Sequence, residues 1–478
     1  MRLYAGALDG EARASFERAR AMPIRVIQIG EGIFLRGFVD WLVHRLNESG
    51  RFHGRIAVVN PRPSGAHHVH QLQEQDGLYT VLVRGMQDGK SVESAELVTS
   101  VARAFDSTRE WARVLQLARD PLVEIAVSNT TELGVRYEPV PRPSSDVPPS
   151  TYPAKLTQYL YERYRALGWQ ETSRMTVVPC ELIDDNGQQL RSIVERHAAD
   201  WKLAGDFLRW LRDRVEFCDT LVDRIVTPYA GDPRLPYEDA LAVTVEPYYL
   251  FAIRGSERLK ALWPFEQVGL HVHYADDIRD FRLRKLRALN GTHTALANLG
   301  LMAGLETVLE VMQHPTLSAY VRHLVYGEIV PATERRVSRP EMLRDFAHDV
   351  LERFQNPYLE HKLRSIATNA VSKARIRLVP TLLDAVERLG DARRLTAAIA
   401  AVCLAYRPGM EHAAEPDPAA DRLRGLWQDN LGASAHAILS DAELWSADLT
   451  QVPGVLDEWI RFVEIALRDG PVQAIASL

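Results

Sequence analysis

The feature that most constrains the fold is a buried strand that leads through a glycine turn into a helix. The apolar run 24–29 is followed directly by Gly30-Glu31-Gly32. A helical stripe comes next, formed by Phe34, Phe38, Trp41, Leu42 and Leu46. A second apolar run then covers residues 56–60. This order of strand, turn, helix and strand predicts a βαβ unit with parallel strands.

The same alternation continues through the first half of the chain. Further strand-like runs cover 79–84, 95–98, 122–128 and 175–180, and helical stretches cover 154–167 and 187–201. From about Asp276 onward, long helical periods replace the strands. We therefore expect an α/β fold with a Rossmann-type, doubly wound N-terminal domain over residues 1–275. A mostly α-helical C-terminal domain is expected over residues 276–478.

Two other segments carry structural expectations. Residues 241–253 alternate valines with aromatic residues, which predicts an added strand pair. The segment 139–153 is rich in proline and serine, which is typical of a long loop.

Composition excludes several classes of protein. Hydrophobic residues make up 46% and charged residues 25% of the 478 residues, as in ordinary globular proteins. A net charge of −6 gives no indication of a nucleic-acid partner or an anionic membrane surface. The longest apolar runs, such as 395–406, are shorter than the roughly 20 residues that a membrane helix needs. Three scattered cysteines and a charged N-terminal segment favour a cytoplasmic protein without disulfides.

The glycine turn is the first candidate for a ligand site. Backbone N–H groups between a strand and a helix can bind a pyrophosphate, so Gly30 and Gly32 are candidate cofactor residues. The third glycine, Gly37, comes late and gives GxGxxxxG in place of the usual GxGxxG. The alternative is that these glycines form only a tight turn.

Other cofactor residues are expected at the ends of neighbouring strands. Asn60 stands where a carboxylate normally binds the adenosine ribose of NAD, and the nearby Arg62 would tolerate the 2′-phosphate of NADP. These residues leave the choice between NAD and NADP open. The other candidates are Phe34 in the first helical turn, and Ser128, Asn129 and Thr130 after a later strand. Their alternative role is turn formation.

A second candidate site lies near residue 290. Lys285, Asn290 and His293 stand at i, i+5 and i+8, which on an α-helix places them within a sector of roughly 140°. A proton donor, an amide and an imidazole on one face suit proton transfer to an alcohol oxygen during hydride transfer. The alternatives are a solvated lysine, a structural histidine, and a helix end at Asn290-Gly291.

Six segments together resemble the mannitol dehydrogenase family, the polyol-specific long-chain dehydrogenases. They are GEGIFLRGFVDW (30–41), SNTTE (128–132), PAKLT (153–157), PCELIDDNG (179–187), FCDTLVDRIV (217–226) and KLRALNGTH (285–293). The resemblance implies a metal-independent dehydrogenase that uses NAD, with NADP not excluded. It also implies that Lys285 is the catalytic acid and base, that Asn290 holds the reacting oxygen, and that His293 positions the substrate.

The resemblance is strongest to members of this family that act on hexuronates. Arg282 stands where mannitol dehydrogenases have a glutamate, and a basic residue suits a small sugar acid as substrate. Candidates for binding the substrate carboxylate are Arg282, Arg287, Lys373 and Arg375. The expected reaction is the reversible reduction of the keto-hexuronate D-tagaturonate to D-altronate. The alternatives are mannitol 2-dehydrogenase, fructuronate reductase and a non-catalytic nucleotide sensor. No metal site is expected, because the histidine clusters 67–70 and 271–273 lack ligand spacing, and the sequence leaves the oligomeric state open.

Overall fold

The computed structural model describes residues 1–130, 134–144, 147–229, 231, 235–410 and 414–478. Contacts between residues divide the chain into two compact units. The first contains residues 1–84 and 92–278, and the second contains residues 85–91 and 279–478. The sequence placed a boundary near residue 275 and gave no signal that the short segment 85–91 groups with the helical unit.

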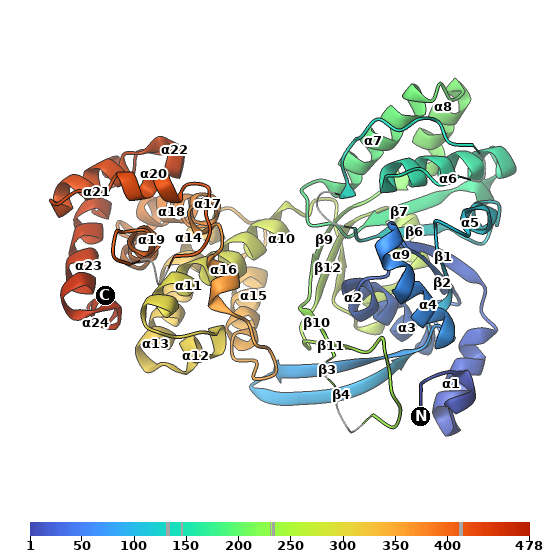
Figure 1. Ribbon diagram of the computed structural model, residues 1–478, viewed down its shortest axis with the longest axis horizontal. Coiled ribbons are helices and arrows are strands. Elements are labelled where there is room, and N and C mark those ends of the chain that lie inside the picture. Colours follow the sequence, from blue (N-terminus) through green and yellow to red (C-terminus); the bar gives the residue numbers. More distant parts are fainter. Residues whose placement is uncertain (131–133, 145–146, 230, 232–234, 411–413) are drawn as a thin grey trace. The chain divides into compact units, whose positions relative to one another are not determined.

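The first unit is built on a six-stranded parallel sheet (Figure 1). Its strands, in spatial order, are β5 (Val101–Phe105), β2 (Arg55–Val59), β1 (Ile24–Ile29), β6 (Ile125–Ser128), β7 (Met175–Pro179) and β8 (Val215–Phe217). All neighbouring pairs run parallel. The predicted Rossmann-type fold is therefore confirmed, although the short strands β5 and β8 carried no recognisable sequence signal.

Both faces of this sheet are buried, and each strand contributes to both. On β1, Val26 belongs to one apolar core and Ile27 to the other. On β2, Val58 and Val59 divide in the same way. This period of two follows from the pleat of a strand. It explains why the strands read as continuous apolar runs, as expected for a parallel sheet covered on both sides.

Helices cover the sheet and connect its strands. They are α1 (Gly10–Arg20), α2 (Ile33–Leu35), the π-helical segment η2 (Arg36–Asp40), α3 (Trp41–Glu48), α4 (Ala66–Glu74), α5 (Trp111–Ala118), α6 (Tyr152–Leu167), α7 (Asn186–Asp200), α8 (Gly205–Arg214) and α9 (Glu257–Leu262). One core contains side chains of α5, α6, α7 and α8, and the other contains side chains of α3 and α4.

Two smaller sheets complete the first unit. One has the order β10 (Val226–Pro228), β11 (Val243–Val245), β3 (Tyr79–Gln87) and β4 (Lys90–Val98). The other has the order β13 (Val272–Tyr274), β12 (Leu250–Arg254) and β9 (Asp219–Asp223). The prediction of a strand pair within 241–253 was wrong, because β11 and β12 lie in different sheets. The alternation of residues showed two strands but held no information on their partners.

The second unit is helical in its described residues, apart from the short segment that it shares with β3 and β4. Its helices are α10 (Arg279–Arg284), η7 (Lys285–Gly291), α11 (Thr292–Met302), α12 (Val308–Gln313), α13 (Pro315–Leu324), η8 (Val325–Ile329), α14 (Val330–Glu334), α15 (Pro340–Arg353), α16 (Leu363–Ala367), α17 (Ala370–Arg377), α18 (Val379–Leu389), α19 (Arg393–Ala405), α20 (Ala420–Gly425), α21 (Leu431–Leu439), α22 (Ala442–Trp445), α23 (Val455–Asp469) and α24 (Pro471–Ala476). Helix α11 is almost entirely buried, and it packs against α16, α17 and α19. It therefore forms the centre of this unit.

Candidate active site

The glycine turn after β1 has a backbone that requires glycine at its first position. Gly30 has a φ of 129°, and a Cβ built there would lie 2.8 Å from the carbonyl oxygen of Asn129. Its N–H donates to the carbonyl of Val59, 2.9 Å away, which holds the turn against β2. A Cβ built on Gly32 would meet nothing within 4 Å. The space beside Gly32 at the start of the helix is therefore open, and the turn fits a dinucleotide pyrophosphate.

Two side chains hydrogen-bond to the carbonyl groups of this turn. The amide of Gln28 donates to the Gly30 carbonyl at 3.1 Å, and the guanidinium of Arg36 donates to the Glu31 carbonyl at 2.9 Å. Both side chains are buried. This arrangement fixes the turn through its carbonyl groups.

The late third glycine has a packing role. A Cβ on Gly37 would lie 2.7 Å from a methyl carbon of Val245 and 2.8 Å from one of Val226. Gly37 therefore lets the π-helical segment η2 approach the small sheet. Phe34, a predicted cofactor residue, is half-buried and stacks on Phe38 with ring centroids 5.0 Å apart.

The predicted polar residues after β2 and β6 lie at the same edge of the sheet. The amide of Asn60 donates to the carbonyl of Arg62 at 3.0 Å, and its oxygen accepts from the N–H of Ser107 at 2.6 Å. The amide of Asn129 donates to the carbonyl of Cys180 at 2.6 Å. These side chains hydrogen-bond to neighbouring segments at the ends of the strands.

Glu181 is a buried residue to which the sequence assigned no role. Its buried carboxylate accepts from the hydroxyl of Ser128 at 3.1 Å and from the N–H and hydroxyl of Thr130 at 3.0 and 3.1 Å. Burial raises its pKa, and the bonds from Thr130 and Ser128 act against that shift. The sequence signal that could have pointed to Glu181 was its position directly after the predicted strand 175–180. Thr131 and Glu132 of the same segment lie outside the described residues.

The candidate catalytic residues lie on a continuous helix that contains a π-helical segment. Helix α10 passes into η7 at Lys285, and η7 passes into α11 at Thr292. In a π-helix, backbone hydrogen bonds join residues i and i+5, so Lys285 and Asn290 lie about one turn apart on the same side. The expected spread of 140° was therefore wrong, because it assumed α-helical geometry. His293 follows Asn290 by three residues, which are neighbours on a helix surface.

His293 lies in a buried and cationic environment. Its ring stacks on Phe354 with centroids 4.4 Å apart and meets the ring of His361 edge-on at 4.7 Å. Burial, followed by His361, Arg353, Arg377 and Lys373, holds the pKa of His293 well below its usual value. The imidazole is therefore neutral at physiological pH. Its buried Nε2 has no hydrogen-bond partner among the described residues, so it can bind a ligand oxygen.

The four candidates for a substrate carboxylate have different surroundings. Lys373 on α17 lies near His293, and its ammonium donates to the carbonyl of Ile366 at 2.8 Å. Arg375 donates to the carbonyl of Glu443 at 3.2 Å. Arg282 is half-buried on α10. The structure thus places Lys373, but not Arg375, in the group of cations around His293.

Arg377 belongs to this group and was missed. Its guanidinium donates to the hydroxyl of Thr294 at 3.2 Å and to the carbonyl of Asn290 at 3.5 Å. Burial lowers its pKa, and within the described residues no carboxylate pairs with it. It stands four residues after Lys373, on the same face of α17.

Arg287 has a carboxylate partner within the protein. Its guanidinium lies 2.6 Å from Asp384 on α18, and both side chains are largely buried, at 8% and 12% exposure. We expect Arg287→Met to lower the free energy of unfolding by about 1–2 kcal/mol, because Asp384 loses its buried partner but keeps the exposed Arg336 at 2.6 Å. Urea unfolding followed by circular dichroism measures this change. An unchanged midpoint, together with a raised KM for a sugar acid, would instead support a binding role.

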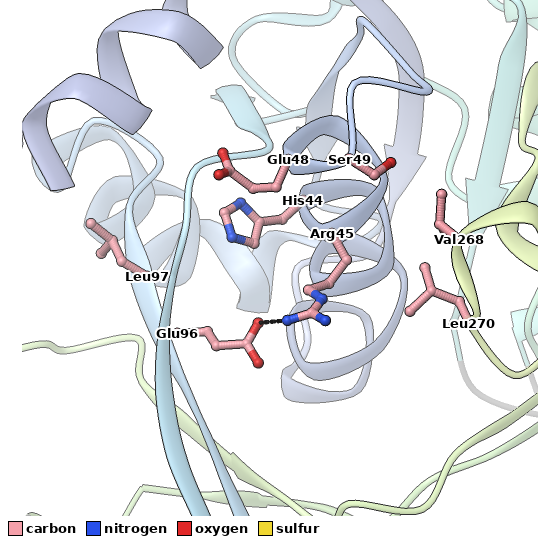
Figure 2. Close-up of a pocket in the computed structure, with 8 residues that line it drawn as sticks. All are labelled: His44, Arg45, Glu48, Ser49, Glu96, Leu97, Val268 and Leu270. Carbon is pink, nitrogen blue, oxygen red and sulfur yellow. Dashed lines mark hydrogen bonds and ion pairs between the residues drawn. The ribbon is translucent and has the colours of Figure 1, made fainter. Parts of the chain in front are cut away.

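A separate pocket of about 490 Å³ lies between α3, β4 and the segment near Leu270 (Figure 2). Arg45 and Glu96 form an ion pair of 3.4 Å at its wall. The residues that line it include none of the predicted cofactor residues. Among the described residues, no group of three or more potential metal ligands occurs. None of the helices described is both long and apolar enough to cross a bilayer.

Sequence comparisons match the two units to known domains. Residues 24–264 match the mannitol dehydrogenase Rossmann domain, and residues 277–464 match the mannitol dehydrogenase C-terminal domain. The altronate oxidoreductase of Halalkalibacterium halodurans is 38% identical, over 96% of this chain and 94% of that protein. The altronate oxidoreductases of Bacillus subtilis and Klebsiella pneumoniae are 38% and 39% identical, over 91% and 95% of this chain and 91% and 97% of those proteins.

Solved structures share the fold. Mannitol 2-dehydrogenase of Pseudomonas fluorescens, in a complex with NAD and D-mannitol, has a TM-score of 0.67 and 21% identity, over 96% of this chain and 95% of that chain. A D-sorbitol dehydrogenase has a TM-score of 0.77 and 18% identity, over 99% of this chain and 97% of that chain. The domain matches and the full-length relatives together show that this chain belongs to the mannitol dehydrogenase family.

Proposed function

We propose that this chain is an NAD-dependent hexuronate dehydrogenase that reversibly reduces D-tagaturonate to D-altronate. The observation that carries the proposal is the pair of cations beside His293, formed by Lys373 and Arg377 on one face of α17. Arg377 is partly buried and has no carboxylate partner among the described residues, and a partly buried cation is costly without an anion to offset it. The carboxylate of a hexuronate supplies that anion. The similarity to altronate oxidoreductases supports the same substrate.

Within this proposal, Lys373 and Arg377 bind the carboxylate. Arg377 offers two guanidinium nitrogens to the two carboxylate oxygens, and the ammonium of Lys373 lies on the same helix face. The unpartnered Nε2 of His293 binds a hydroxyl of the sugar acid. These three groups fix the orientation of the substrate relative to Lys285 and Asn290.

Lys285 and Asn290 act on the reacting oxygen. In the direction of reduction, Lys285 gives a proton to the carbonyl oxygen as it becomes an alcohol, and in the reverse direction it takes that proton back. The amide of Asn290 donates a hydrogen bond to the same oxygen while negative charge develops on it. The π-turn supports this pairing, because it brings residues five apart to the same side of the helix.

The turn at Gly30 and Gly32 is proposed to bind the pyrophosphate of NAD. The open space beside Gly32 and the anchored carbonyls of the turn support this role. When bound, the nicotinamide supplies or accepts the hydride. A non-catalytic nucleotide sensor would need this turn but would not need the arrangement around Lys285.

Initial rates of NADH oxidation with D-tagaturonate, D-fructuronate and D-fructose test the proposal. We expect turnover with D-tagaturonate to exceed that with either of the other two, and D-altronate to appear as the product. Turnover confined to D-fructose would place the chain with the polyol dehydrogenases. NADH binding without turnover of any of the three would favour the sensor.

A further inference from the structure

The side chain of Glu31 reaches from the glycine turn to the chain segment that follows β2. A Cβ built on Gly65 would lie 2.0 Å from Oε1 of Glu31 and 3.1 Å from the Cβ of Asn60. The carboxylate therefore lies directly over Gly65 and beside the end of β2. Any larger residue at position 65 would displace it.

The other polar groups at the end of β2 are already bound within the protein. The amide of Asn60 donates to the carbonyl of Arg62 at 3.0 Å and to Asp106 at 3.4 Å, and its oxygen accepts from Ser107 at 2.6 Å. The carbonyl of Pro61 accepts from the ammonium of Lys155 at 3.1 Å. Asn60 is fully buried. Its side chain thus offers little to a ribose, which is the role that the sequence suggested for it.

The surroundings of Glu31 combine partial burial with positive charge. Burial raises its pKa, while its own backbone N–H and the charges of Arg36, Arg62 and His67 act against that shift. Arg36 also fixes the backbone of Glu31 by its hydrogen bond to the carbonyl. Arg62 and His67 are exposed. The carboxylate is thus partly buried and lies within the electrostatic influence of the solvent-facing Arg62.

In dinucleotide-binding folds, a carboxylate at the end of the second strand accepts hydrogen bonds from the adenosine ribose and excludes the 2′-phosphate of NADP. We propose that Glu31 supplies this carboxylate from the preceding glycine turn and so makes the protein selective for NAD over NADP. The inference rests on the proposed use of a nicotinamide dinucleotide. It further assigns Arg62 as the group that would bind a 2′-phosphate once the carboxylate is removed.

Cofactor binding without any sugar acid tests this assignment. Dissociation constants of NADH and NADPH are measured by quenching of tryptophan fluorescence, for the full chain and for Glu31→Gln and Glu31→Ala. We expect each substitution to weaken NADH binding about tenfold and to strengthen NADPH binding about tenfold, because a charge-assisted bond is lost and a repulsion is removed. Adding Arg62→Met to Glu31→Gln should abolish the gain for NADPH.

Glu74→Gln is the matched control, because Glu74 lies on α4 of the same unit and pairs with His70 at 3.2 Å. It should leave both constants unchanged. An unchanged ratio of the two constants in both Glu31 variants would overturn the assignment, while NADH binding would still support the proposed function. An equal decrease in the dissociation constants of NADH and NADPH would also overturn the assignment, since Glu31 would then only repel the pyrophosphate that both cofactors share. A parent protein that binds neither cofactor would overturn the proposed function together with this inference.

Discussion

Replacing Lys285 with methionine is expected to lower kcat with D-tagaturonate about a thousandfold, because general acid catalysis typically contributes between a hundredfold and ten thousandfold. Methionine keeps much of the length of the lysine side chain but cannot donate a proton. Lys285 lies at the first residue of the π-helical segment and is half-buried. The substitution should therefore remove the proton donor without disturbing the core. Steady-state NADH oxidation measures kcat, and fluorescence quenching measures NADH binding, which we expect to remain unchanged.

Lys260→Met is the control for this substitution. Lys260 lies on α9 in the first unit and pairs with Glu266 at 3.3 Å. Its replacement should leave kcat within about twofold of the parent, as is usual for a surface change of this kind. If Lys285→Met also kept its turnover with every sugar acid, the role of Lys285 as proton donor would be wrong.

Replacing Arg377 with methionine is expected to reduce kcat/KM for D-tagaturonate by about a hundredfold. A charge-assisted hydrogen bond contributes about 1.5–3 kcal/mol, and each 1.4 kcal/mol corresponds to a factor of ten. The substitution should mainly raise KM and change kcat little, because the carboxylate is bound equally in the substrate and in the transition state. With the neutral ketose D-tagatose, the same substitution should change kcat/KM little. Kinetics with the two substrates in parallel provide the measurement.

Arg375→Met is the matched control for Arg377→Met. Both arginines lie on α17, but the guanidinium of Arg375 donates to the carbonyl of Glu443 and not to groups near Asn290. Its replacement should leave the preference for D-tagaturonate intact. Equal losses in the two variants, or equal losses with both substrates, would argue that Arg377 only supports the fold.

The glycine turn and the order of strands and helices could be predicted because they depend on local chemistry. Gly30 adopts a φ that favours glycine, and the apolar run before it is long enough to be recognised as a strand. Strand β11 pairs with β3, and strand β12 pairs with β9. These partners are distant in the sequence, and the alternation of apolar residues within a strand does not indicate which strand pairs with it. The role of Gly37 likewise became visible only with Val226 and Val245 beside it.

The candidate catalytic residues were proposed from the sequence, but the sequence did not indicate their geometry. The sequence carried no signal for the π-helical segment at Lys285, so an α-helical period gave the wrong angle to Asn290. Arg377 was missed because nothing in the sequence showed which face of α17 is turned toward His293. Once Lys373 is placed on that face, the spacing of four residues leads directly to Arg377, while Arg375 lies on another side.

The most direct test of the account is the ratio of kcat/KM for D-tagaturonate to kcat/KM for D-tagatose with NADH. The two compounds differ in the carboxylate, so the ratio measures what the cations around His293 contribute. We predict a ratio of about a hundred or more, since two cations bind the carboxylate. A ratio near one would contradict the assignment of these cations to substrate binding, and with it the proposed hexuronate substrate.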